Sequence, residues 1–391
     1  MFKNNKNLFV IAVIAIVNAL GYGIIIPILY SYSQRFGLND FQNGMLFATF
    51  SVCQFISTPI IGRWSDRYGR KPLLIASLIG TALSFVLMAI APNAIFLFIA
   101  RALDGLTAGN ISVASAVISD TTAPKDRAKG FGIIGASFGF GFVFGPAISA
   151  FTVGFGAGVP FIIAAVITVI AVVLTAVLLP ETNTHKHRDH KGRLFDIGGL
   201  IKFAVDPKVG KILIVSLLYS FALALFIFAY QPTSVKVLHL NEQQISINYT
   251  LFGLVGLITQ MLLIPRVTKL LGERKAFATA LVVACFGFLG MYISKSMWPF
   301  VVISLIYGIA NSFVNPLLQA LLSRAADEKS QGSIMGVNAS YVSLGMIFGP
   351  IIGGVLALRD LALPFLLGLI VCIGCFILSR GIVIHGKAHV E

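Results

Sequence analysis

Hydrophobic residues gather along this chain in long segments separated by short polar connections. Each segment has about 20 residues, which is the length that a helix needs to cross the hydrocarbon core of a bilayer. The predicted spans cover residues 8–30, 43–62, 72–91, 95–119, 130–151, 160–180, 211–233, 246–266, 276–294, 299–323, 333–356 and 362–382. The pattern therefore predicts an all-α membrane protein with twelve transmembrane helices.

The longest polar stretch divides the predicted spans into six and six. It occupies residues 181–210, between an N-terminal six-helix bundle (1–180) and a C-terminal six-helix bundle (211–391). The motifs "GFVFGPAISA" and "GMIFGPIIGG" begin 204 residues apart, and "RVTKLLGERK" follows "RWSDRYGRKP" at an offset of 203. Two markers at nearly one offset indicate duplication, hence two pseudo-symmetric bundles with a substrate site between them near the midplane.

Composition excludes a soluble protein. The chain is 57% hydrophobic and only 11% charged, with a mean hydropathy of +0.91, whereas soluble domains carry about 25% charged residues. The net charge of +14 is a topology signal, because 24 basic residues fall in connections on one side and four on the other. The positive-inside rule then places both termini in the cytoplasm of a multi-pass protein of the inner (plasma) membrane. We expect no nucleic-acid partner.

Residues typical of metal or cofactor sites are sparse. The histidines of "HKHRDH" (His185, His187, His190) fit a solvated linker better than a metal site, and Cys372 and Cys375 are expected to pack as small apolar residues. No zinc-protease, nucleophile-elbow or phosphate-binding loop motif occurs, so we expect neither an enzyme nor ATP-driven transport. We expect no metal and no cofactor, with protons as the coupling ion.

Four motifs carry a family resemblance. "GRWSDRYGRK", between spans 2 and 3, resembles the loop signature of the major facilitator superfamily, and "RALDGLTAG" resembles its span-4 motif. "GFVFGPAISA" resembles the antiporter signature of the drug–proton exchangers, with Ser149 and Ala150 in place of the last glycines. "NALGYGIIIP" resembles a span-1 motif of that group, with Asn18 replacing an acid. The nearest likeness is to the tetracycline and multidrug exporters.

The resemblance implies a gating latch at the cytoplasmic mouth, made by Gly62, Asp66, Arg67, Gly69, Arg70 and Asp120. Asp66 would cap a helix of the second half near Ser333, and Arg70 would pair with Asp66 and Asp120. The alternative is a positively charged stop signal that sets topology only. Topology needs the positive charge but neither Asp66 nor the two glycines.

Six further residues form the repeated helix-packing motif. They are Gly141, Gly145 and Pro146 in span 5 and Gly345, Gly349 and Pro350 in span 11. Glycines four residues apart share one helix face and let a neighbouring helix approach closely, and a proline bends its helix. We expect these segments to form the rocking interface between the two halves.

Arg101 and Asp104 are the only charged residues predicted deep in the bilayer. At a spacing of three they share a helix face and can pair, and an ionisable residue at that depth is a functional candidate by default. We assign proton coupling to this pair. The alternatives are a structural ion pair anchoring span 4, or a pH response dominated by Asp40 near the outer face.

The other candidates for the substrate site are neutral amides and aromatic residues, each of which could instead join helices. They are Asn18, Tyr22, Gln54, Asn110, Tyr219, Phe226, Tyr230, Gln231, Asn248, Tyr249, Asn311, Asn315, Gln319, Asn338 and Tyr341. Such a lining suits an amphiphilic, partly planar substrate. We therefore expect a monomeric, proton-coupled exporter of small amphiphilic compounds, of the multidrug or tetracycline type, working by alternating access. The alternative is a proton-linked symporter or facilitator of a small metabolite on the same fold.

Overall fold

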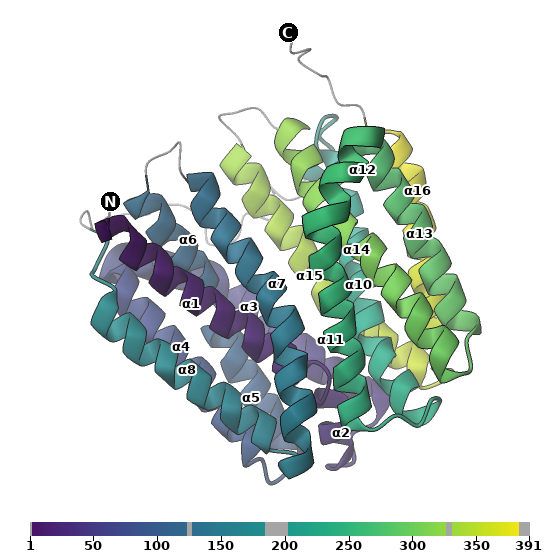
Figure 1. Ribbon diagram of the computed structural model, residues 1–391, viewed down its shortest axis with the longest axis horizontal. Helices are drawn as coiled ribbons and strands as arrows, with labels where there is room; N and C mark the ends of the chain where they lie inside the picture. Colours follow the sequence, from purple (N-terminus) through teal and green to yellow (C-terminus); the bar gives the residue numbers. More distant parts are fainter. Residues whose placement is uncertain (1, 123–126, 184–201, 326–330, 383–391) are drawn as a thin grey trace, which may run out of the picture. The chain divides into compact units, whose positions relative to one another are not determined.

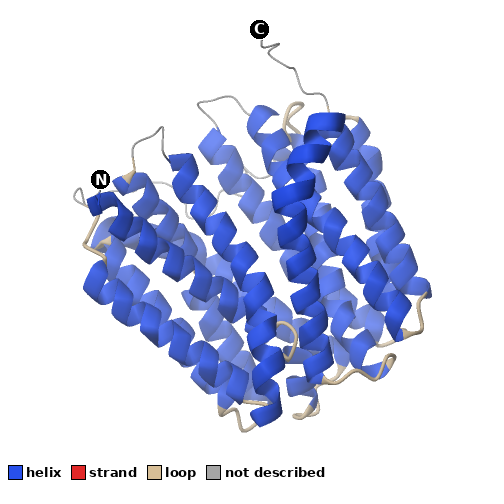
Figure 2. Cartoon of the chain, in the orientation of Figure 1, coloured by secondary structure: helices blue, strands red, loops and turns tan. Residues whose placement is uncertain are grey.

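The computed structural model describes the whole chain except residues 1, 123–126, 184–201, 326–330 and 383–391. Within the described residues the regular structure is helical and contains no strand (Figure 2). Twelve helical segments there are long and apolar enough to cross a membrane, six before residue 184 and six after residue 201. The all-α, twelve-span class predicted from the sequence is confirmed.

The helices keep the labels of Figure 1. The first group is α1 (Phe2–Ile25), α2 (Leu29–Gln34), α3 (Asp40–Tyr68), α4 (Arg70–Ala89), α5 (Ala94–Thr107), α6 (Asn110–Thr121), α7 (Arg127–Thr152), the short 3₁₀ turn η2 (Val153–Phe155) and α8 (Val159–Leu178). The second group is α10 (Gly210–Lys236), α11 (Glu242–Ile258), the π-helical segment η3 (Thr259–Leu263), α12 (Ile264–Leu271), α13 (Glu273–Ile293), α14 (Met297–Ala325), α15 (Gln331–Ala357) and α16 (Leu363–Arg380).

The first span ends earlier than predicted. Instead of continuing to residue 30, α1 ends at Ile25, a turn follows, and the separate helix α2 begins at Leu29. Pro27 explains the difference, because proline has no backbone N–H to donate and its ring clashes with the carbonyl of the residue four positions earlier.

Two other spans are interrupted. Span 4 consists of α5 and α6, which meet at a break at Ala108 and Gly109. Span 8 passes through the π-helical segment η3 just before Pro265. Such bulges often occur where the regular hydrogen-bond ladder cannot continue. Arg101 and Asp104 lie on α5, before the break, and α6 forms the rest of the span.

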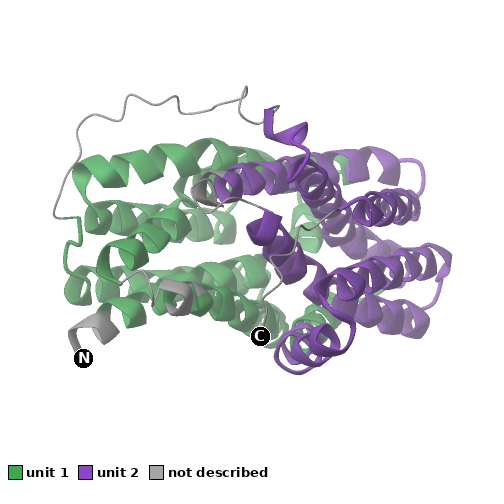
Figure 3. Cartoon of the chain, turned by 90° about the horizontal axis from the view of Figure 1, so that it is seen from above, with its two compact units in different colours: residues 1–194, 239–254 green, residues 195–238, 255–391 purple. Residues whose placement is uncertain are grey.

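The chain forms two compact units (Figure 3). Unit 1 contains Met1–Leu194 and His239–Leu254, and unit 2 contains Phe195–Leu238 and Val255–Glu391. The first part of α11 therefore packs with the helices of the first half of the chain. The division predicted at residues 181–210 stays a prediction, since most of that linker lies outside the described residues.

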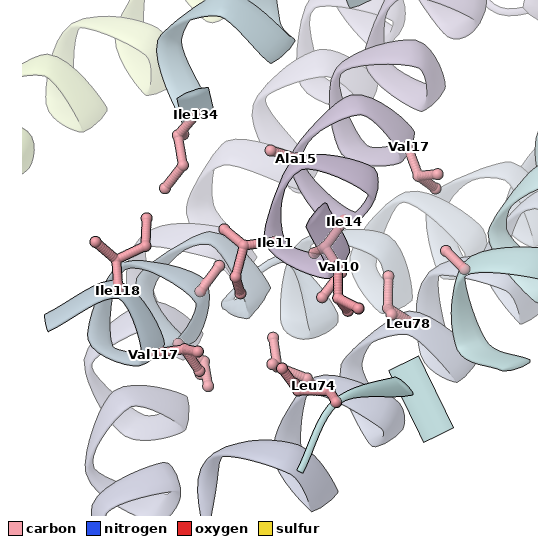
Figure 4. Close-up of a cluster of buried hydrophobic side chains, with 14 of the residues drawn as sticks. Val10, Ile11, Ile14, Ala15, Val17, Leu74, Leu78, Val117, Ile118 and Ile134 are labelled. Carbon is pink, nitrogen blue, oxygen red and sulfur yellow. The ribbon is translucent and has the colours of Figure 1, made fainter. Parts of the chain in front are cut away.

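The core of unit 1 is aliphatic. Val10, Ile11 and Ile14 repeat on one face of α1 and meet Leu74 and Leu78 of α4, with further buried residues from α6 and α8 (Figure 4). This spacing is that of a helix stripe facing its neighbours. In lipid such contacts act through close van der Waals packing rather than removal from water.

The core of unit 2 is aromatic. Phe226 of α10 lies 4.6 Å from Tyr307 of α14, measured between ring centroids, and Tyr307 lies 5.0 Å from Phe288 of α13. Tyr230 lies 5.2 Å from Phe300. These distances and the tilted or edge-to-face ring angles are those of favourable aromatic pairs. All five side chains are buried, so they fix α10, α13 and α14 together.

Candidate functional site

Among the described residues of unit 1, Arg101 is the most buried charged side chain, and it pairs with Asp104 on the same helix, α5. Arg101 Nη1 lies 3.3 Å from Asp104 Oδ2, and the two side chains are 2% and 9% exposed. Arg101 Nε has no hydrogen-bond partner among the described residues. The predicted pairing is present, and it is imperfect, because charge-assisted bonds of this type are usually 2.7–2.9 Å long.

Close packing of α5 against α3 places Arg101 beside an aromatic wall. The Ser57 hydroxyl donates to the Gly105 carbonyl at 2.9 Å, so the two helices touch at a glycine. The Arg101 guanidinium then sits 4.5 Å from the centre of the Phe50 ring, a cation–π arrangement. The Tyr22 ring lies 6.2 Å from Phe50. Arg101 of span 4 and Tyr22 of span 1, both candidates from the sequence, therefore lie beside the same Phe50 ring.

The wall continues on α7, where the Phe142 ring meets Tyr22 edge-on at 6.0 Å. Neither Phe50 nor Phe142 was predicted from the sequence, because phenylalanine is common throughout the spans and carries no polar signal. Cys53, also outside the prediction, packs against Gly105, the residue after Asp104. The site in unit 1 is therefore one buried ion pair with aromatic rings on one side.

The other polar candidates of unit 1 differ in burial: Asn18 and Gln54 are half-buried, whereas Asn110, Asn248 and Tyr249 are buried. Asn18 donates from Nδ2 to the Ile14 carbonyl of its own helix at 2.8 Å, and Gln54 is half-buried. Asn110 at the start of α6 is fully buried, and neither of its amide atoms has a partner among the described residues. Asn248 and Tyr249 are buried on the part of α11 that belongs to unit 1.

In unit 2 a polar stripe runs along α14. Asn311, Asn315 and Gln319 are four residues apart, which puts them on one helix face, and the last two are exposed. Tyr219 of α10 donates its hydroxyl to Asn311 Oδ1 at 3.1 Å. Exposed amides in an apolar span favour a face toward a water-filled cavity, because polar groups facing lipid are costly.

The remaining candidates of unit 2 are buried. Tyr219, Phe226 and Tyr230 lie in or beside the aromatic core, and Gln231 follows them on α10. Asn338 and Tyr341 are buried on α15. Their assignment as substrate contacts stays a prediction.

The loop motif between α3 and α4 is built around Arg70. Its Nη1 lies 2.5 Å from Asp66 Oδ1 and its Nε lies 2.9 Å from Asp120 Oδ2, and Nη1 also donates to the Ser65 hydroxyl at 2.6 Å. Both ion pairs expected from the sequence are present. Gly69 has a φ of +112°, which side-chain-bearing residues rarely adopt, so glycine is needed at this turn.

The other members of the motif have simpler surroundings. The Arg67 guanidinium lies 5.3 Å from the centre of the Tyr68 ring. A Cβ on Gly62 would lie 3.9 Å from the Ser112 hydroxyl oxygen. The predicted contact of Asp66 with the helix near Ser333 is not tested, since the Ser333 side chain lies outside the described residues. The gating role stays a prediction.

Two residues of the motif's surroundings were missed from the sequence. Glu181, just after α8, accepts from the backbone N–H groups of Arg70 and Lys71 at 2.9 and 3.2 Å, which caps the start of α4. Asn183 donates from Nδ2 to the Asp66 carbonyl at 2.8 Å and to the Ser65 carbonyl at 3.3 Å. In the sequence these two residues are an acid and an amide that directly follow an apolar span. That position could have indicated a capping role, but it also looks like the start of the polar linker.

The repeated glycine motif packs inside each unit. A Cβ on Gly141 would lie 2.2 Å from Ala19 Cβ, and one on Gly145 would lie 2.7 Å from Gly23 Cα, so this face of α7 touches α1. The expected close packing is present, because the small residues Ala19 and Gly23 of α1 let the two backbones approach. The role of this segment as a rocking interface between the halves stays a prediction.

The second copy behaves in the same way. A Cβ on Gly345 would lie 2.2 Å from Ser220 Oγ, and one on Gly349 would lie 2.5 Å from Ala224 Cβ, which places this face of α15 on α10. Pro146 and Pro350 lie inside the continuous helices α7 and α15. The corresponding helix pairs α1–α7 and α10–α15 have the same small-residue contact.

Known proteins resemble the chain along its whole length. The family model of the Major Facilitator Superfamily matches residues 11–211 and 212–384. Multidrug resistance protein 2 of Bacillus subtilis (strain 168) is 30% identical over 95% of this chain and 94% of that protein. Tetracycline resistance protein, class E, of Escherichia coli is 30% identical over 89% of this chain and 87% of that protein.

Solved structures share the fold. A bacterial homologue of the human lysosomal transporter Spinster, in an inward-facing and unoccupied conformation, has a TM-score of 0.78 at 15% identity and covers 98% of both chains. The human organic anion transporter MFSD10 has a TM-score of 0.74 at 20% identity, over 96% of this chain and 99% of that one. With the twelve spans and the family match over both halves, these findings show that the chain belongs to the major facilitator superfamily and is a multi-pass membrane transporter.

Proposed function

We propose that this transporter exports small amphiphilic compounds in exchange for protons. The observation that carries the proposal is the buried Arg101–Asp104 pair beside the aromatic wall of unit 1. Support also comes from the relatives, which are named as multidrug and tetracycline resistance proteins. We further propose that the protein acts as a monomer in the plasma membrane with both termini in the cytoplasm.

The pair is poorly built for stability, which favours a functional role. Burying two charges costs several kcal/mol per ion, and only excellent geometry offsets that cost. Here one contact of 3.3 Å joins the two groups, and Arg101 Nε is left without a partner among the described residues. A carboxylate in a bilayer interior is a proton-site candidate by default.

The proposed coupling step is a change in the charge of Asp104. A proton on the carboxyl group removes its attraction for Arg101, and the guanidinium then shifts toward the aromatic wall or toward substrate. The Ser84 hydroxyl, which donates to the Thr81 carbonyl at 2.7 Å, also lies beside Asp104. Loss of the proton restores the pair. Binding of proton and of substrate would thus favour different conformations of the transporter.

The aromatic wall suggests the substrate class. The rings of Tyr22, Phe50 and Phe142 offer apolar faces next to a single cation, Arg101. Planar apolar groups pack well on such rings, and a polar or anionic substituent would reach the guanidinium. The exposed amides Asn315 and Gln319 of unit 2 would supply further hydrogen bonds. This combination suits an amphiphile better than a sugar or a highly charged solute.

The cytoplasmic motif would act as the inner gate. Arg70, Asp66 and Asp120 form one network at the ends of α3, α4 and α6, held by the capping of α4 by Glu181. We propose that Asp66 engages the helix dipole at the start of α15 when the inside is closed and releases it on opening.

Proton exchange is tested with purified protein in proteoliposomes loaded with a pH-sensitive dye. Under an imposed pH gradient, tetracycline, ethidium and other amphiphiles are added to the wild type, to Asp104→Asn and to Asp40→Asn. Asp40 is a matched control because its carboxylate is also buried and accepts from Tyr30. We expect a substrate-triggered proton movement that Asp104→Asn abolishes and Asp40→Asn preserves.

Three results would contradict parts of the proposal. Equal responses of the wild type and Asp104→Asn make the pair structural. Loss in Asp40→Asn alone moves the coupling to the start of α3. Equilibration of a solute without any proton movement replaces the exporter with a facilitator.

A further inference from the structure

Span 4 is broken in its middle. It covers residues 94–121 within unit 1, but α5 ends at Thr107 and α6 begins at Asn110. At the break the Ala108 N–H donates to the Gly105 carbonyl, only three residues earlier, at 3.2 Å. No proline lies in this span, so the sequence also permits a continuous helix here.

Helices α3 and α4 hold the segment before the break. The Ser77 hydroxyl of α4 donates to the Thr107 carbonyl, and there is no room for a Cβ on Gly80 beside the Thr107 side chain. The Ser57 hydroxyl of α3 donates to the Gly105 carbonyl at 2.9 Å. These two carbonyl groups at the end of α5 are therefore satisfied by neighbouring helices while the span is broken.

The first residue of α6 has no such partner. The Asn110 side chain is fully buried, and neither its Nδ2 nor its Oδ1 has a hydrogen-bond partner among the described residues. These amide atoms are sealed from solvent, so neither substrate nor bulk water reaches them in this conformation. Because an unmet buried amide is costly, Asn110 raises the free energy of the broken form of span 4.

A continuous span would give Asn110 a partner within its own helix. Asn18, in the uninterrupted helix α1, donates from Nδ2 to the Ile14 carbonyl four residues earlier at 2.8 Å. In a straight span 4 the carbonyl four residues before Asn110 is that of Leu106. The two forms of the span thus exchange the side-chain hydrogen bond at the end of α5 for one at the start of α6.

The two parts of span 4 carry the two charged networks of unit 1. Arg101 and Asp104 pair on α5, and Asp104 lies in the last turn before the break. Asp120 lies at the end of α6 and accepts from Arg70 Nε at 2.9 Å. A change in the angle between α5 and α6 therefore moves one network relative to the other.

We propose that the break at Ala108 and Gly109 is a hinge of the transport cycle, and that Asn110 is a positioning residue that favours its straight form. Opening of the Arg101–Asp104 pair frees the last turn of α5, which then continues into α6 and shifts Asp120 relative to Arg70. The coupling pair would release the inner gate in this way, a step that rests on the proposed function.

The hinge is tested by double electron–electron resonance between nitroxides at Ile95→Cys on α5 and Ala116→Cys on α6, after replacement of the four native cysteines. In one straight helix these Cα atoms would lie about 32 Å apart. We expect Asp104→Asn, which removes the charge of the carboxylate, to lengthen the distance found in the wild type. Labels at Ile162 and Val177, both exposed on the uninterrupted helix α8, are the control and should not move apart.

Asn110→Ala separates the hinge from a substrate contact. It removes the amide, so the lengthening caused by Asp104→Asn should disappear. The maximal rate of proton movement triggered by tetracycline or ethidium should fall about tenfold, because one buried hydrogen bond present in a single form shifts an equilibrium by about that factor. The half-saturating substrate concentration should stay unchanged.

Thermal unfolding separates the hinge from a role in stability alone. Asn110→Ala should melt no lower than the wild type, because no hydrogen bond among the described residues is lost. Asn43→Ala is the matched control, since Asn43 is equally buried but accepts from the Ser33 hydroxyl and donates from Nδ2 to the Asn39 carbonyl at 3.1 Å. That variant should melt lower.

Three outcomes overturn the proposal. Equal distances in the wild type and Asp104→Asn show that span 4 does not bend with the pair. A higher half-saturating concentration at an unchanged maximal rate makes Asn110 a substrate contact. A melting temperature lowered as much by Asn110→Ala as by Asn43→Ala shows that the Asn110 amide is satisfied. The distances are measured without transport, so loss of the proton-exchange proposal would leave the hinge to be judged by them alone.

Discussion

Replacing both members of the Arg101–Asp104 pair should leave the protein stable but inactive. The pair has one contact of 3.3 Å, an Arg101 Nε without a partner among the described residues, and a ring contact of 4.5 Å with Phe50. The ring contributes about 0.5–2 kcal/mol, less than the several kcal/mol that burying each ion costs. Well-packed apolar residues in place of such a pair are often neutral or stabilising by about 1–4 kcal/mol.

The single variants should behave differently from the double variant. Arg101→Met leaves the Asp104 carboxylate buried without its partner, and Asp104→Leu leaves the guanidinium alone, each costing about 3–5 kcal/mol. The double variant Arg101→Met/Asp104→Leu should recover at least the wild-type free energy of unfolding. The two losses would therefore be strongly non-additive, as expected for residues in contact.

The assay is equilibrium unfolding in mixed micelles titrated with sodium dodecyl sulfate, followed by dye-monitored proton exchange on the same four proteins. A double variant destabilised by the sum of the single losses would refute the reasoning, because the pair would then be a net stabilising contact. A stable double variant that still exchanges protons with substrate would retain the energetic argument and remove the coupling role.

Three further predictions concern packing, capping and surface charge. Gly145→Val should lower the melting temperature, because even a Cβ there would lie 2.7 Å from the backbone of α1 and overpacking costs about 1–3 kcal/mol. Gly135→Val, on the same helix, points into open space and should be tolerated. Glu181→Ala should cost about 0.5–2 kcal/mol as a lost helix cap and speed hydrogen exchange at the first amides of α4; unchanged exchange would show that the cap contributes nothing. The ion pair of Arg35 with Glu242, at 3.0 Å, should contribute about 0.2–1 kcal/mol at low salt, so Arg35→Glu and Glu242→Arg should each lower the melting temperature and their combination should restore it. Additive losses in the charge-swapped protein would show that the two residues act independently.

Hydropathy was sufficient for the fold class and the number of spans. In lipid every backbone polar group must be satisfied within the segment, so an apolar stretch of about 20 residues has to be a helix. Local spacing was also sufficient for the pairing of Arg101 with Asp104, because residues three apart share a helix face. The pairs of Arg70 with Asp66 and Asp120 were likewise expected, through the family resemblance.

The partners of each helix face were decided by the tertiary structure alone. Helix periodicity shows that Gly141 and Gly145 share a face, but the small residues of α1 that meet them lie more than a hundred residues earlier in the chain. The same limit applies to Phe226, whose aromatic signal suits either a cavity or the core in which it packs.

The capping of α4 by Glu181 shows the division most clearly. Sequence determined where α3, α4 and α8 are apolar and that a glycine turn separates the first two. Only the packing of α8 along α4 brings a carboxylate from residue 181 to the backbone amides of residues 70 and 71. Local preferences act within a few residues along the chain, whereas a helix end is satisfied by whichever polar group the fold brings to it.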